Sequence, residues 1–174
     1  MKDELREKLS GGDLRSIGKA DEVVSEIKSQ MDFDILFDFL LSDNRLIAMR
    51  AADAIEKITM KRADFLCGHK EEVLALCKRA DNIEFKWHLA LLLSRLPFTE
   101  NEHAEVFEVL SSWLIDPRES KIVRVNSMQA LFEISKQDRA AQQQFENILN
   151  EVEKENIPSL LARIRKIRRQ FHNK

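Results

Sequence analysis

The sequence predicts an all-α protein of about five antiparallel helix pairs, and three observations lead to this fold class. Only 4 Gly and 3 Pro occur among 174 residues, too few for the many tight turns of a sheet protein. Apolar residues recur at the spacing of one helix face in successive segments of the chain. The clearest of these segments start 38 residues apart, at Asp43, Asp81 and Glu119, which indicates an internal repeat.

The three segments share one helical register. They read DNRLIAMRAADAIEKI, DNIEFKWHLALLLSRL and ESKIVRVNSMQALFEI. Positions 4, 8, 11, 12 and 15 after each start lie on one helix face and are expected in the core. They hold Ile47, Ala51, Ala54, Ile55 and Ile58, then Phe85, Leu89, Leu92, Leu93 and Leu96, then Val123, Ser127, Ala130, Leu131 and Ile134. A fourth segment, which starts at Gly12, has Ser16, Ala20, Val23, Val24 and Ile27 in the same places.

Each of these helices is expected to follow a partner helix after a short turn. The expected partners are 1–10, 34–41, 71–78 and 102–115, and a last pair comprises 139–153 and 158–171. Asp or Asn in the turns can cap the second helix of a pair. The chain therefore divides into repeats of roughly 1–28, 32–59, 69–96, 100–136 and 138–172, within a single expected domain of 1–174.

The stretch FDILFDFLLSDNRLIAMRAADAIEKI, Phe33 to Ile58, resembles HEAT and armadillo-type repeats. The resemblance implies an α-α superhelix, a right-handed solenoid whose second helices line a concave face. The family pattern has an arginine where Arg50 stands, but the other repeats have Lys19, His88 and Asn126. We expect these four side chains to hydrogen-bond exposed carbonyls or an Asp of a neighbouring turn.

Chemical motifs are sparse. Cys67, His69 and Cys77 lack the close ligand spacing of a zinc site, and Cys77 falls at a core position. The chain has no GxGxxG, P-loop, HExxH or GxSxG motif, so we expect no cofactor, no metal and no catalytic residue. The charged N-terminus is not a signal peptide, and the longest apolar run, Leu89–Leu93, cannot span a membrane. With only two cysteines, a cytoplasmic location is expected.

An apolar stripe is expected opposite the core face of the second helices. Trp87, Leu91, Val125 and Phe132 would line a groove on the concave side, with Met49 and Met128 at its margins. Such a groove could hold a partner helix or peptide. The alternative is that these side chains pack between adjacent repeats or beneath the final helix.

The C-terminal helix carries the clearest charge asymmetry in a chain whose net charge is −2. From Ile157 onward there are six basic residues and no acidic one: Arg163, Arg165, Lys166, Arg168, Arg169 and Lys174. Two interpretations stay open. The helix can close the repeat array next to an acidic body, or it can bind nucleic acid, anionic lipid or an acidic partner.

The leading functional hypothesis is a non-enzymatic scaffold or adaptor that presents a concave surface to a protein or peptide partner. The first alternative is a nucleic-acid-interacting protein similar to HEAT-like DNA glycosylases, in which Trp87 acts with Asp53 or Asp81. The second is a bilin-lyase-like protein. The family resemblance allows all three.

Overall fold

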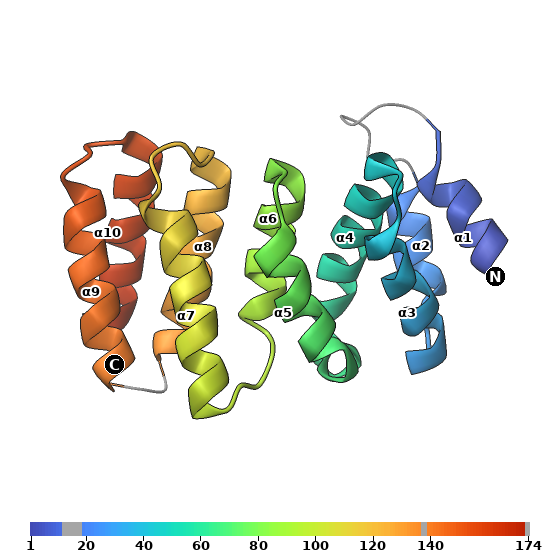
Figure 1. Cartoon of the computed structure of the whole chain (residues 1–174), viewed down its shortest axis with the longest axis horizontal. Coiled ribbons are helices and arrows are strands. Elements are labelled where there is room, and N and C mark those ends of the chain that lie inside the picture. Colours follow the sequence, from blue (N-terminus) through green and yellow to red (C-terminus); the bar gives the residue numbers. More distant parts are fainter. Residues whose placement is uncertain (12–18, 137–138, 173–174) are drawn as a thin grey trace. The chain divides into compact units, whose positions relative to one another are not determined.

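The computed structural model describes residues 1–11, 19–136 and 139–172. These residues form ten α-helices and two short 3₁₀ segments, with no strand among them, which confirms the all-α prediction (Figure 1). The predicted positions Gly12 and Ser16 lie outside the described residues. The chain divides into two compact units, Met1–Lys70 and Glu71–Lys174. That all five pairs form one continuous domain stays a prediction.

The first unit contains two helix pairs. Its helices are α1 (Lys2–Leu9), α2 (Ala20–Glu26), α3 (Gln30–Phe37) and α4 (Arg45–Thr59). The 3₁₀ segment Asp38–Leu41 extends α3, and a second one, Ala63–His69, ends the unit. Contacts join α1 with α2 and α3 with α4, as the sequence predicts.

The second unit contains the last six helices. They are α5 (Lys70–Arg79, whose first residue belongs to the first unit), α6 (Ile83–Leu93), α7 (Glu100–Ile115), α8 (Lys121–Ser135), α9 (Arg139–Glu153) and α10 (Pro158–His172). Contacts join α7 with α8 and α9 with α10, as the sequence predicts. Figure 1 shows α7 with α8 and α9 with α10 as neighbouring pairs. Helix α8 contacts α6, α7, α9 and α10. Because four helices surround it, α8 exposes little of its surface.

The 38-residue register is visible in the helix N-caps. Asn44, Asn82 and Ser120 precede α4, α6 and α8, and each accepts a backbone N–H from the first turn with its side-chain oxygen. These residues stand 38 apart in the chain, so each repeat starts its second helix at the same place. Of the core positions predicted in the three repeats, all are buried except Phe85, which is half-buried.

Two buried arginines close helix ends. Arg50 on α4 is 1% exposed and donates to the carbonyls of Leu9 and Ser10, at 3.0 and 2.9 Å, where α1 ends. The last carbonyls of a helix have no partner within the helix, so the guanidinium satisfies them. The carbonyl-binding role predicted for Arg50 is therefore confirmed.

The second buried arginine is Arg124, two residues before the predicted Asn126. Its Nε donates to the Leu114 carbonyl at the end of α7 at 2.7 Å. Its two terminal nitrogens bind both carboxylate oxygens of Glu155, at 2.7 and 2.5 Å, in the turn between α9 and α10. The four side chains expected at one repeat position thus differ in their surroundings, since Asn126 is half-buried and Lys19 is exposed.

Leu93→Asp tests the predicted core. Leu93 is fully buried in α6, so the substitution places an unpaired carboxylate among apolar side chains. We expect a loss of at least about 3 kcal/mol in the free energy of unfolding, measured by urea denaturation with far-UV circular dichroism. Ile83→Asp is the matched control, because Ile83 lies in the same helix and is 46% exposed. Equal losses in both variants would contradict the core assignment.

The Arg124–Glu155 pair predicts a pH dependence of stability. Hydrogen bonds from Arg124 outweigh burial and hold the pKa of Glu155 below its usual range. A carboxylate with a lowered pKa in the folded state stabilises the fold above its unfolded pKa, about 4.3, and loses this contribution as the pH falls through its folded pKa. We expect Glu155→Gln to reduce the loss of stability between neutral and acidic pH, measured by urea denaturation across that range.

Glu151→Gln is the control for this experiment. Glu151 is 68% exposed and pairs with Lys154, one turn further along the chain. A surface pair of this kind contributes little to stability. If both variants have the pH dependence of the wild-type protein, the Arg124–Glu155 pair does not contribute as inferred.

Candidate functional site

Apolar side chains of α6 and α8 in the second unit are partly open to solvent. Trp87 and Leu91 of α6 and Val125 of α8 are half-buried, and the groove predicted for them stays a prediction. Ile83, one turn before Trp87, is 46% exposed, and Ile122, three residues before Val125, is 43% exposed. Residues three and four apart lie on the same helix face. We name these five residues the apolar stripe.

Two residues of the predicted groove are buried instead. Met128 and Phe132 of α8 are 0% and 1% exposed. The ring of Phe171 on α10 meets the ring of Phe132 edge-on at 4.8 Å between centroids, so the final helix covers it. This is the packing alternative considered for the stripe, and it removes Met128 and Phe132 from any open surface. Met49 is half-buried on α4 of the first unit, and its place in a groove stays a prediction.

The basic residues of α10 serve different purposes. Arg168 donates to Glu146 and Glu153 of α9 at 2.8 and 2.9 Å, and also to Asn150. This arginine fastens the last helix to its partner, as expected of a helix that closes the array. Three others, Arg165, Lys166 and Arg169, are exposed.

Arg163 lies at the end of the apolar stripe. Its guanidinium donates to the side-chain oxygen of Gln129 on α8 at 2.7 Å. Gln129 stands one turn after Val125 on the same face, and its amide donates in turn to Glu133 at 2.8 Å. Glu133 also pairs with Lys136. Because an amide is neutral, the contact with Gln129 positions Arg163 without neutralising its charge.

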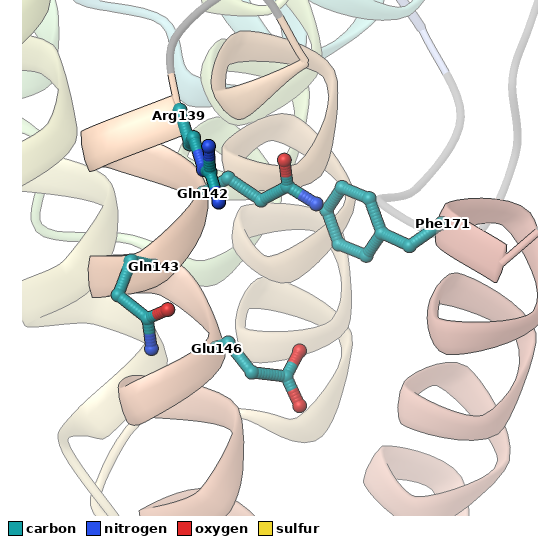
Figure 2. Close-up of a pocket in the computed structure, with 5 residues that line it drawn as sticks. All are labelled: Arg139, Gln142, Gln143, Glu146 and Phe171. Atoms are coloured by element: carbon teal, nitrogen blue, oxygen red, sulfur yellow. The ribbon is translucent and has the colours of Figure 1, made fainter. Parts of the chain in front are cut away.

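A pocket of about 380 Å³ lies between α9 and the end of α10. Figure 2 shows the Phe171 ring reaching from α10 toward α9, where one helix face presents Arg139, Gln142, Gln143 and Glu146. Glu146 is already paired with Arg168. The lining is therefore polar apart from Phe171, which is unlike the mostly apolar pockets that hold large cofactors.

The cysteine and histidine residues near 67–77 have structural surroundings. Burial raises the pKa of the Cys77 thiol far above its usual value, which leaves it protonated and unreactive. In the first unit, His69 stacks on Phe37 at 4.0 Å and lies 2.7 Å from an oxygen of Asp34. Cys67 is exposed. Within the described part of the chain, no three His, Cys, Asp or Glu side chains are grouped so that they could hold a metal ion.

Sequence reasoning missed Ile83, Ile122 and Arg124. The two isoleucines carried a usable signal, because they continue the helical spacing of Trp87 and Val125 toward the start of each helix. Arg124 carried no such signal, because it does not stand at the repeat position that holds Arg50, His88 and Asn126.

One protein family matches nearly the whole chain. A family model described as a HEAT repeat domain matches residues 1–171. No curated protein and no solved structure is similar enough to the chain to count as a match. Among residues 1–11, 19–136 and 139–172, no helix is both long enough and apolar enough to cross a membrane.

Paired truncations test which residues form a surface. Phe132→Ser removes a buried ring, and we expect it to cost about 3–5 kcal/mol of stability. Trp87→Ser removes a half-buried one, and we expect less than half of that loss. Urea denaturation followed by far-UV circular dichroism measures both. Similar large losses would place Trp87 in the core and remove it from the apolar stripe.

Proposed function

The chain belongs to the HEAT repeat family, and from this we propose that it is a non-enzymatic scaffold that binds a protein or peptide partner on the apolar stripe. HEAT repeats are helical scaffolds that typically mediate protein interactions. The cytoplasmic location expected from the sequence stays a prediction.

The observation that carries the proposal is the exposure of Ile83 on the helix of the half-buried Trp87 and of Ile122 on the helix of the half-buried Val125. Exposed apolar side chains that follow one another on neighbouring helices favour an interaction site. Buried residues such as Leu89 and Leu131 anchor the same two helices, so the surface is held in place before a partner arrives. A tryptophan in such a surface is a frequent anchor of binding energy.

A nucleic-acid-binding function is the second candidate, supported by the exposed Arg165, Lys166 and Arg169. The glycosylase-like version is less well supported, because Asp53 is paired with Lys57 at 2.9 Å. The bilin-lyase-like version would need an apolar pocket for a tetrapyrrole, whereas the pocket in Figure 2 is lined mainly by polar side chains.

Affinity capture with charge-substituted surfaces tests the scaffold function. We expect Ile83→Glu with Ile122→Glu to lose specific partner proteins that the wild-type chain captures from a native cell extract, because carboxylates would interrupt the apolar contact. Quantitative mass spectrometry of the captured proteins is the measurement. Both isoleucines are exposed, so the variant should fold, which far-UV circular dichroism checks.

Ile115→Glu is the matched control for this capture. Ile115 is 49% exposed at the end of α7 and is not part of the apolar stripe. This variant should keep the wild-type partners. If the stripe variant and the control capture the same proteins as the wild type, the apolar stripe is not the binding surface.

A further inference from the structure

We propose that the pocket between α9 and the end of α10 binds a nucleotide, with the base stacked on Phe171 and the phosphate at Arg139. The pocket shares no residue with the apolar stripe, so this site does not depend on the proposed function. Three features of the pocket point to such a ligand: an aromatic ring held in place, an amide group without a partner, and a cation without a partner.

The ring of Phe171 is held in place from the side of the core. It packs edge-on against the rings of Phe132 and Phe145, at 4.8 and 6.5 Å between centroids, and both of those residues are buried. Phe171 itself is half-buried and lines the pocket, so part of its surface is open to a ligand (Figure 2). Every nucleobase has a flat face that stacks on an aromatic side chain.

The α9 wall of the pocket offers hydrogen bonds to the edge of a base. Gln142 and Gln143 line this wall, and each amide carries two N–H donors and a carbonyl acceptor. Figure 2 shows the Gln142 side chain pointing toward Phe171. Among the described residues, the Gln142 amide has no hydrogen-bond partner. Because base edges present donors and acceptors, an amide in this position complements them.

Arg139 supplies the positive charge for a phosphate. It is the exposed first residue of α9, and its guanidinium forms no hydrogen bond or ion pair within residues 1–11, 19–136 and 139–172. A guanidinium can bind a phosphate through two parallel hydrogen bonds. The carboxylate of Glu146 also lines the pocket, but Arg168 donates to it at 2.8 Å. This ion pair reduces the repulsion that a free carboxylate would exert on an anion.

The size and polarity of the pocket favour a small polar ligand with one flat face. Its volume of about 380 Å³ lies near the lower end of the range of small-molecule pockets, about 300–1,000 Å³. Apart from Phe171, the lining side chains are polar, and a fully apolar ligand would leave them without partners. A nucleotide combines a flat face, a polar edge and a phosphate. A nucleoside lacks the phosphate, and a sugar phosphate lacks the base.

Saturation-transfer difference NMR on the full chain tests the site. The four ribonucleoside 5′-monophosphates are titrated, and we expect the base protons of the tightest binder to receive the strongest saturation, because the base contacts Phe171. The corresponding nucleoside and ribose 5-phosphate are the matched probes. Each should bind about tenfold more weakly than the nucleotide, because each lacks one of the two main contacts.

Two single substitutions assign the contacts. Arg139→Ala should weaken nucleotide binding by about tenfold and leave nucleoside binding close to wild type, because only the phosphate loses a partner. Arg165→Ala is the matched control: Arg165 is also an exposed arginine of the second unit, but it does not line the pocket. This control should leave both affinities unchanged.

The base contact is tested with Gln142→Leu and Phe171→Leu. Both variants should weaken the nucleotide and the nucleoside alike, because both lose a contact with the base. Phe171 also packs on Phe132, so far-UV circular dichroism checks that its variant folds. Gln142 has no role in that aromatic cluster, so Gln142→Leu keeps the test informative if Phe171→Leu unfolds.

A short single-stranded oligonucleotide identifies the source of the nucleotide. If it binds more tightly than the mononucleotides and loses affinity in Arg139→Ala, the site holds one nucleotide of a strand; if it binds more weakly, the ligand is a free nucleotide. Ribose 5-phosphate that binds as tightly as the nucleotides overturns the inference, because the base then contributes nothing. Nucleotide binding that is unchanged in both Arg139→Ala and Gln142→Leu, or no binding of any probe at millimolar concentration, also overturns it.

Discussion

Two buried guanidinium groups, one in each compact unit, donate hydrogen bonds to carbonyls at helix ends. Arg50 closes the end of α1, and Arg124 joins the end of α7 to the turn between α9 and α10 through Glu155. A buried charge is costly unless hydrogen bonds and an opposite charge compensate it. Carbonyls of a helix end supply hydrogen bonds in both cases, and Glu155 supplies an opposite charge for Arg124, so each arginine ties one helix end to another helix of its unit.

The burial of α8 follows from this stacking and decides what surface remains. Helices on four sides cover it, and α10 closes over Phe132 through Phe171. Only the first turns of α8 keep apolar side chains at the surface, where Ile122 and Val125 adjoin α6. The candidate binding surface is therefore what the last helix leaves uncovered, and its extent depends on how α10 packs.

The basic residues of α10 differ in their contacts, so the position of each one matters more than their total number. Arg168 contributes to the stability of the last pair, since two carboxylates and an amide of α9 bind it. Arg163 borders the apolar stripe, and Arg165 and Arg169 face solvent. One basic helix thus contains an arginine that binds its partner helix and others that are exposed. The total charge of the helix does not distinguish the two groups.

Local periodicity was sufficient to predict the helix pairs, the 38-residue register marked by Asn44, Asn82 and Ser120, and the core positions, because helical spacing specifies which side chains point inward. It could not show that Phe132 is covered while Ile83 is open, or that Arg124 takes the place expected of Asn126. These outcomes depend on contacts between residues far apart in the chain, such as Phe132 with Phe171 and Arg124 with Glu155. Spacing along one helix carries no information about which neighbour covers its other face, so only the tertiary structure decides it.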